Sequence, residues 1–294
     1  MARKSILDLY EMKRRGEKIT WLTAYDYPTA SFEVSAGIDM ILVGDSLGMC
    51  VYGYSGTVPV TMDQCVVHTE AVRRAAPDVF LMGDMPFMSY QVCDEEAVRN
   101  AGRFLQEADV DAVKLEGGVR VASRIKAIRD AGIIVCGHIG LTPQSSGQLG
   151  GHKAQGRTLD AAELVVKDAR AVYEAGAQLL LIEAVPPEVA GFIRHELPIP
   201  VIGLGAGSDV DGQLLIVSDM LGIFQAFKPK FVKRFANIAG VATAALTQYV
   251  NEVRDGTFPS DEYCYHMLEG EALRFEKWAS AQGNSELTSS SSGS

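Results

Sequence analysis

The sequence predicts an α/β protein built as a single (β/α)8 barrel, with one helix before the first strand. Short aliphatic runs alternate with helical stretches along most of the chain, and eight such strand–helix units can be counted. The chain has 294 residues, of which 47% are hydrophobic, which matches the size of one α/β barrel. A doubly wound open sheet is the alternative, because the sequence alone does not prove that the sheet closes.

The eight predicted strands are short runs rich in aliphatic residues. Their length and composition are typical of parallel strands, which helices cover on one face and the barrel interior on the other. In chain order they are residues 19–23, 40–44, 79–83, 111–116, 133–137, 178–182, 200–203 and 214–217.

Helical stretches precede the first strand and follow most of the others. They are residues 5–15, 28–36, 62–75, 94–108, 119–131, 159–175, 187–195 and 231–250. Thr61 and Asp94 can cap two of these helices, and a proline begins the helix at 187. We expect one catalytic barrel domain over residues 1–282. Residues 283–294 are rich in Ser and Gly and bury little apolar surface, so a disordered tail is expected there.

The charge balance argues against two classes of partner. The chain has 27 Lys and Arg against 37 Asp and Glu, a formal net charge of −10, and no basic run beyond Lys13-Arg14-Arg15. Nucleic acid and an anionic membrane surface are therefore not expected partners. No stretch reads as a signal peptide or membrane span, and the five scattered cysteines are typical of reduced thiols. We expect a cytoplasmic protein that acts on small molecules.

Two aliphatic runs end in Gly-Asp, and this repetition predicts a cation site. Asp45 follows the second predicted strand and Asp84 follows the third. Neighbouring parallel strands lie about 4.8 Å apart, so both carboxylates would face the same small volume. Two carboxylates that close repel each other unless one is protonated or a cation lies between them. A hard divalent ion is the simplest explanation, and helix capping by each aspartate is the alternative.

Polar and glycine residues follow nearly every predicted strand, where the active sites of barrel enzymes lie. They are Asp26, Asp45 with Ser46, Asp84, Lys114 with Glu116, His138, Glu183, the glycine-rich residues 203–207, and Asp219. Any one of them could belong to a solvent-facing loop. Consecutive strand ends that supply several ionisable groups, however, favour an enzyme over a structural barrel.

Motifs spread over most of the chain resemble the ketopantoate hydroxymethyltransferase family. They are TAYDYP (23–28), VGDSLGM (43–49), DMPFMSY (84–90), KLEGG (114–118), GHIGLTPQ (137–144), QGR (155–157), EAVP (183–186), GLGAG (203–207) and DGQ (211–213). Two positions depart from the family pattern: His152 stands where an aromatic residue is common, and Ser218 where a histidine is.

This resemblance implies transfer of a hydroxymethyl group from 5,10-methylenetetrahydrofolate to 2-oxoisovalerate, giving ketopantoate in pantothenate biosynthesis. It also implies a magnesium-stabilised enolate and a homo-oligomer, a decamer. In the family pattern Asp45 and Asp84 match the Mg²⁺ ligands, with Glu116 behind them holding metal-bound water. Ser46 and Lys114 match groups that bind the substrate carboxylate, together with the two metal aspartates. Glu183 matches the general base and His138 an active-site hydrogen-bonding partner.

Two other functions remain open from the sequence. Barrels of the phosphoenolpyruvate mutase and isocitrate lyase type also act on magnesium-bound 2-oxo acids, but their lyases place a reactive cysteine after a lysine pair. Here Cys136 precedes Gly137-His138 without those lysines. A barrel kept only as an assembly scaffold is the non-enzyme alternative. Residues 142–158 are expected to form either a lid over the folate or a mobile loop without a role.

Overall fold

The computed structural model describes residues 3–289, which divide into two compact units between Ala239 and Gly240. The first unit holds every strand. We expected residues 240–282 to belong to the barrel domain, but they lie in the second unit, which contains α11 (Ile238–Asp255) from Gly240 onward, η3 (Asp261–Tyr263) and α12 (Glu271–Ser289). Residues 283–289 of the expected disordered tail are the last turns of α12, and residues 290–294 lie outside the described residues.

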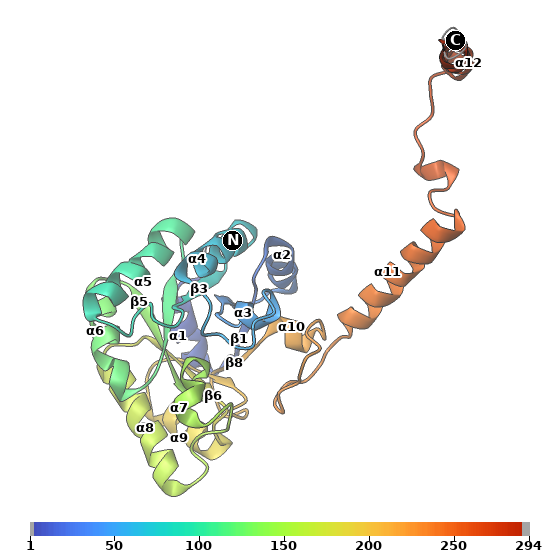
Figure 1. Ribbon diagram of the computed structural model, residues 1–294. Helices are drawn as coiled ribbons and strands as arrows, with labels where there is room; N and C mark the ends of the chain where they lie inside the picture. Colours follow the sequence, from blue (N-terminus) through green and yellow to red (C-terminus); the bar gives the residue numbers. More distant parts are fainter. Residues whose placement is uncertain (1–2, 290–294) are drawn as a thin grey trace. The chain divides into compact units, whose positions relative to one another are not determined.

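Eight parallel strands form a closed barrel in sequence order, so the predicted fold class is confirmed and the open sheet is excluded (Figure 1). Every strand pairs in parallel with the next, and β1 pairs with β8 to close the barrel. The strands are β1 (Ile19–Thr23), β2 (Met40–Val43), β3 (Phe80–Asp84), β4 (Ala112–Glu116), β5 (Ile134–Gly140), β6 (Leu179–Glu183), β7 (Val201–Leu204) and β8 (Gly212–Leu215).

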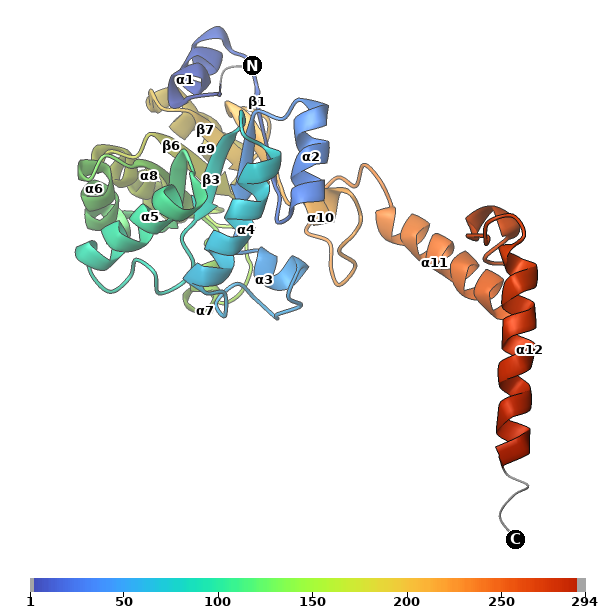
Figure 2. The ribbon, with the colours of Figure 1, turned by 90° about the horizontal axis from the view of Figure 1, so that it is seen from above.

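Helices surround this barrel, and short helical turns follow several strands. The main ones are α1 (Ile6–Arg15), α2 (Tyr27–Ala36), α4 (Met62–Ala75), α5 (Asp94–Ala108), α6 (Ala122–Asp130), α8 (Leu159–Glu174) and α9 (Pro187–Glu196). The short ones are α3 (Leu47–Cys50), η1 (Val119–Val121), η2 (Pro143–Ser145), α7 (Ser146–Leu149) and α10 (Val217–Met220). Figure 2 shows α1 at one end of the barrel and α3 and α7 at the other.

Several predicted boundaries differ from the observed ones. β5 extends three residues beyond the predicted end, so His138 lies within the strand. β8 begins and ends earlier than predicted, and Val217 already starts α10. Thr61 caps α4 through a capping box, as predicted, whereas Cys93 takes the N-cap position of α5 and Asp94 its first helical position.

The largest correction concerns residues 231–250, which we predicted to be one helix. Helix begins only at Ile238, and Phe231 lies in the irregular segment that follows α10. The aromatic ring of Phe231 packs against the backbone of Gly205 at the end of β7, where an added Cβ would approach the ring to 2.5 Å. A contact between distant segments therefore determines the conformation of this stretch.

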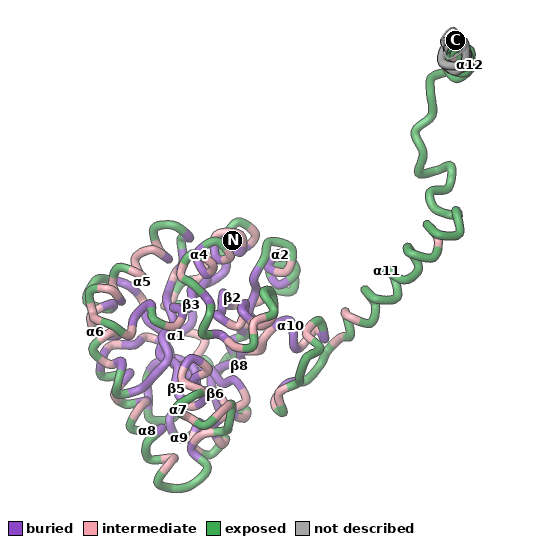
Figure 3. The backbone as a smooth tube through the Cα atoms, in the orientation of Figure 1, coloured by how far each residue is buried: buried purple, intermediate pink, exposed green. Residues whose placement is uncertain are grey.

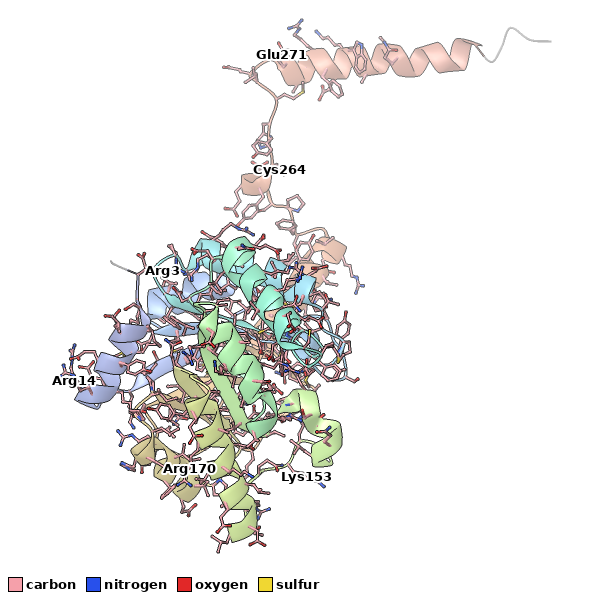
Figure 4. The ribbon with its side chains drawn as sticks, turned by 90° about the vertical axis from the view of Figure 1, so that its left-hand side faces the viewer. Arg3, Arg14, Lys153, Arg170, Cys264 and Glu271 are labelled. Atoms are coloured by element: carbon pink, nitrogen blue, oxygen red, sulfur yellow. The ribbon has the colours of Figure 1, made fainter. Side chains whose placement is uncertain are left out.

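Two apolar clusters hold the barrel unit together. One fills the barrel interior and includes Trp21, Phe80 and Leu181, and the other lies between the strands and the helices. Leu9 of α1 is fully buried in the interior cluster, so α1 closes the N-terminal end of the barrel. Figure 3 shows the strands buried at the centre of this unit, and Figure 4 shows Arg14 of α1 and Lys153 on opposite sides of it.

None of the helices among residues 3–289 combines the length and apolar character that crossing a bilayer requires.

Candidate active site

Strand alternation directs five ionisable side chains into the barrel: Asp84, Lys114, Glu116, His138 and Glu183. Successive side chains of a strand point to opposite faces, so residues two apart share a face. On β3, Asp84 follows Phe80 and Met82, both of which belong to the interior cluster. On β4, Lys114 and Glu116 share the face of the interior residue Ala112. On β5, His138 shares the face of Cys136, and on β6 Glu183 shares the face of Leu179 and Leu181.

The register of the sheet then places these residues beside one another. Asp84 is paired with Lys114 across β3 and β4, and Glu116 with His138 across β4 and β5. Glu183 is paired with Gly140 across β5 and β6. The polar groups therefore form a continuous arc at the C-terminal ends of four neighbouring strands, above the apolar interior.

Asp45 joins this arc from the loop after β2. Its backbone N–H donates to Asp84 Oδ2 at 2.9 Å, which fixes the two aspartates side by side. The adjacent Ser46 lies 2.8 Å from the hydroxyl of Tyr25, between their oxygens. The prediction that the two Gly-Asp motifs meet is thus confirmed by the geometry.

Lys114 is the cation at the centre of the cluster, and its side chain is 3% exposed. Its Nζ lies 2.7 Å from Asp84 Oδ1, 3.7 Å from Glu116 Oε1 and 3.4 Å from His138 Nδ1. Burial lowers the pKa of the Lys114 ammonium, but the charges of Asp84, Glu116 and Asp45 outweigh burial and raise it. Lys114 is therefore charged at neutral pH and is not a surface lysine.

Two residues that the sequence analysis did not single out organise the carboxylates. Gln144 donates from its side-chain nitrogen to Asp45 Oδ2 at 2.9 Å and from its backbone N–H to Glu116 Oε2 at 3.0 Å. Tyr90 donates its hydroxyl to Gln144 Oε1 at 2.7 Å. Both residues lie within matched motifs, but Gln144 is in the short helical turn η2, where no strand periodicity shows which way a side chain points.

His138 and Glu183 form a pair on the far side of Lys114. His138 Nε2 lies 3.2 Å from Glu183 Oε2. Burial and the nearby Lys114 ammonium lower the pKa of His138, so the imidazole is neutral at pH 7. Because an ammonium can only donate, Nδ1 of His138 accepts from Lys114 and the imidazole proton lies on Nε2, facing Glu183.

The backbone around Glu183 is unusual. Ala184 has a φ of 50°, in the left-handed region that non-glycine residues seldom adopt. At Gly140, on the neighbouring strand, an added Cβ would lie 2.3 Å from the carbonyl oxygen of Glu183. Gly140 thus permits the close approach of the two strands, and the strained Ala184 turns the chain away immediately after Glu183.

The four carboxylates of the cluster carry more negative charge than Lys114 can balance. Burial raises the pKa of Asp45, and the charge of Glu116 raises it further. Burial also raises the pKa values of Asp84, Glu116 and Glu183. Such a site favours either an added cation or an added proton.

These residues line one cavity of about 780 Å³ at the C-terminal end of the barrel. All seven predicted site residues contribute to its wall: Asp45, Ser46, Asp84, Lys114, Glu116, His138 and Glu183. Other parts of the wall come from His152, Ala154 and Arg157, within the segment predicted to be a lid or a mobile loop, and from the segment after α10. The backbone N–H of Gln155 donates to the carbonyl of Ala184 at 2.9 Å and ties the former segment to the site.

Two of the aspartates that follow predicted strands, Asp26 and Asp219, do not belong to the carboxylate cluster. Asp26 is the N-cap of α2 and accepts a hydrogen bond from the backbone N–H of Thr29 at 2.8 Å, so it is a structural cap. Asp219 of α10 lines the cavity, but among the described residues its side chain has no hydrogen bond or ion pair with the carboxylate cluster. Gly205 of the glycine-rich segment lies in the cavity wall beneath Phe231.

A closed barrel with a buried cluster of acids, lysine and histidine at the C-terminal ends of its strands defines the class: an enzyme of the (β/α)8 type. The family model described as ketopantoate hydroxymethyltransferase matches residues 3–261. The chain belongs to this family.

Relatives bear the same description. A 3-methyl-2-oxobutanoate hydroxymethyltransferase of Alkaliphilus metalliredigens is 62% identical over 275 residues, covering 94% of this chain and 97% of that protein. A protein of the same name from Moorella thermoacetica is 53% identical and covers 90% of this chain and 98% of its own length.

Solved structures with little sequence identity share the fold. A phosphonopyruvate hydrolase in complex with oxalate and Mg²⁺ matches with a TM-score of 0.58 at 14% identity, covering 95% of this chain and 98% of that one. A 2,3-dimethylmalate lyase matches with a TM-score of 0.58 at 16% identity, covering 95% and 98%. At this level of identity the match supports the barrel architecture alone.

Proposed function

We propose that this chain transfers a hydroxymethyl group from 5,10-methylenetetrahydrofolate to 2-oxoisovalerate and so forms ketopantoate for pantothenate biosynthesis. Membership of the family and the relatives named 3-methyl-2-oxobutanoate hydroxymethyltransferase support this activity. The observation that carries the proposal is the buried pair of Glu183 and neutral His138 beside an excess of carboxylates, within one cavity.

Glu183 is the proposed general base, which takes the proton from C3 of the keto acid. Burial raises the pKa of its carboxyl, which makes Glu183 a stronger base than an exposed glutamate. His138 Nε2 lies 3.2 Å from Glu183 Oε2, and because the imidazole is neutral it stabilises the ionised carboxylate less than a cation would. The pair therefore positions the base without abolishing its affinity for a proton.

Asp45 and Asp84 are the proposed ligands of a magnesium ion, with Glu116 behind them. Their oxygens are the ligand type that Mg²⁺ prefers, and the surplus of buried negative charge fits a divalent cation. Among the described residues no group of three or more His, Cys, Asp or Glu side chains is arranged to hold a metal ion, so water and substrate would complete a two-carboxylate site. When bound, the ion would act as a Lewis acid that stabilises charge on the keto oxygen.

Lys114 and Ser46 are the proposed partners of the substrate carboxylate. The ammonium is buried and charged, and it already forms an ion pair with Asp84, so it brings positive charge to the inner end of the cavity. The hydroxyl of Ser46 lies 2.8 Å from the hydroxyl of Tyr25, which holds it next to Asp45. An anionic keto acid needs such groups in a chain with a net charge of −10.

The proposal also includes the folate co-substrate, a cytoplasmic location and a homo-oligomer of ten subunits. These three parts rest on the family resemblance. The alternative of a lyase with a reactive cysteine loses support, because Cys136 lies inside the barrel and burial raises the pKa of its thiol to about 12. A thiol with that pKa stays protonated at neutral pH.

Hydrogen exchange at C3 of 2-oxoisovalerate in D₂O tests the function. With Mg²⁺ present and folate absent, the protein should remove the C3 proton, and the proton NMR signal should disappear. A chelator should stop the exchange, because charge on the keto oxygen then lacks a Lewis acid.

A scaffold barrel would give no exchange under any condition, and a mutase or lyase of another substrate would leave this proton largely in place. Absence of exchange in the wild-type protein with magnesium bound would overturn the proposed function.

A further inference from the structure

The cavity is much larger than the keto acid requires. Its volume of about 780 Å³ lies in the range of pockets that hold drug-sized ligands. The charged cluster occupies the wall formed by β2 to β6, whereas the segment after α10 and the ends of β7 and β8 form another part of the wall. A second part of the site is therefore available for a second molecule.

Asp219 stands out in this second part of the wall. It is 7% exposed, and its carboxylate has no hydrogen bond or ion pair with any side chain or backbone group in the described chain. Burial raises the pKa of Asp219 to about 6, although the charge of Arg234 opposes the shift. A largely buried carboxylate that faces a cavity and has no protein donor is poorly solvated, so a ligand that brings N–H groups would stabilise it.

Aromatic rings accompany this carboxylate. Phe224, Phe227 and Phe231 all line the cavity. The rings of Phe224 and Phe227 meet edge to face with centroids 5.4 Å apart, and Phe231 is held against Gly205. Flat faces in the same cavity as a largely buried acceptor suit a planar heterocycle with donors along one edge.

We propose that Asp219 anchors the pterin ring of the folate co-substrate. This inference rests on the proposed function, which supplies the folate. The reduced pterin carries an N3–H and a 2-amino group on the same edge, and a carboxylate can accept both hydrogen bonds side by side. The phenylalanines of the same cavity then cover the face of the ring, and Asp219 acts as a binding residue rather than a catalytic one.

The first test measures binding of 6-methyltetrahydropterin, which lacks the folate tail, by isothermal titration. Asp219→Asn should bind it and tetrahydrofolate at least about 10-fold more weakly, because one charged hydrogen bond is lost. Asp26→Asn is the matched control: this aspartate lies at the same end of the barrel but outside the cavity, and both affinities should stay unchanged.

A second test changes the ligand and uses the wild-type protein. The analogue with a methyl in place of the 2-amino group should bind the wild-type protein at least about 10-fold more weakly than 6-methyltetrahydropterin does. In Asp219→Asn the two ligands should bind alike. Equal binding of both ligands by the wild-type protein would overturn the assignment, even if the variant fails to fold.

The folate-free exchange at C3 of 2-oxoisovalerate separates this inference from the proposed function. Asp219→Asn should retain that exchange, since the keto acid and Glu183 do not depend on the pterin. If Asp219→Asn loses both the exchange and its affinity for the pterin, Asp219 has a structural role and the assignment is overturned. If the wild-type protein binds the pterin through Asp219 but shows no exchange, the proposed function fails and the pterin site stands.

Discussion

The two ends of the barrel both bury charged residues, but they balance charge in opposite ways. At the N-terminal end three aspartates, Asp39, Asp111 and Asp211, lie immediately before β2, β4 and β8. Each one pairs with at least one Lys or Arg and also accepts the backbone N–H of a residue on a neighbouring strand. At the C-terminal end four carboxylates share one lysine and a neutral histidine.

Asp211 illustrates the balanced end. Its two carboxylate oxygens lie 2.7 Å from Lys13 Nζ and 2.8 Å from Arg194 Nε, and Oδ2 also accepts the N–H of Val201 at 2.9 Å. These contacts join α1, α9, β7 and β8. Every strong acceptor has a donor, which is what stability requires of a buried charge.

The comparison shows that burial of charge alone does not indicate a catalytic site. The two ends differ in charge balance. The cations at the N-terminal end neutralise the carboxylates there, whereas the single lysine at the C-terminal end does not neutralise the four carboxylates around it. Burial without sufficient pairing raises the pKa values of Asp84 and Glu183, which leaves one end able to bind a cation and accept a proton.

The largest expected effect concerns the unbalanced end. Glu183→Gln keeps the size of the side chain but removes the proton acceptor, so turnover should fall by about 10²–10⁴-fold, while magnesium and keto acid still bind. Steady-state kinetics and titration calorimetry measure these quantities. Turnover within a few-fold of wild type would mean that another group is the base.

The balanced end should respond in stability rather than in turnover. Asp211→Asn leaves Lys13 and Arg194 without a counter-charge, so the free energy of unfolding should fall by about 3–5 kcal/mol. Urea denaturation measures this loss, and kcat per folded molecule should stay unchanged. A variant with wild-type stability but impaired turnover would contradict the division between the two ends.

Substitutions at the two ends should also differ in their effect on Mg²⁺ affinity. Asp45→Ala and Asp84→Ala should each weaken Mg²⁺ binding at least about 10-fold, because one carboxylate with water is a poor site for an ion that releases water reluctantly. Asp39→Ala at the other end serves as the control and should leave the affinity unchanged. Wild-type affinity in both C-terminal variants would exclude these aspartates as ligands.

Most of the architecture could be predicted from the sequence, because buried parallel strands leave short aliphatic runs. The meeting of Asp45 and Asp84 followed from strand spacing and the repeated Gly-Asp. The roles of Gln144 and Phe231 could not be predicted. Gln144 reaches Asp45 from the single turn η2, which is too short to show a periodicity. A contact with Gly205 overrides the helical pattern of the segment around Phe231.

The smallest expected effect is a difference in how stability depends on pH in the metal-free protein. Burial raises the folded-state pKa of Glu183, so between the unfolded value, about 4.3, and the folded value the folded state holds more protons. Stability should therefore fall as pH rises through this window. At Asp39 burial raises the pKa, but Lys4 and Thr20 outweigh it and lower the value. The ionised Asp39 carboxylate should therefore stabilise the folded state above about pH 4, and this contribution should be lost as the pH falls further.

Urea denaturation between pH 4.5 and 8 with a chelator present separates the two contributions. Glu183→Gln should flatten the decline by about 1.4 kcal/mol for each unit by which the pKa is raised. Asp39→Asn should lower stability by a similar amount at every pH in this range, because both the folded and unfolded aspartate are already ionised there. An unchanged slope in Glu183→Gln would remove Glu183 as a source of the imbalance, and a changed slope in Asp39→Asn would show that the N-terminal end is not balanced at neutral pH.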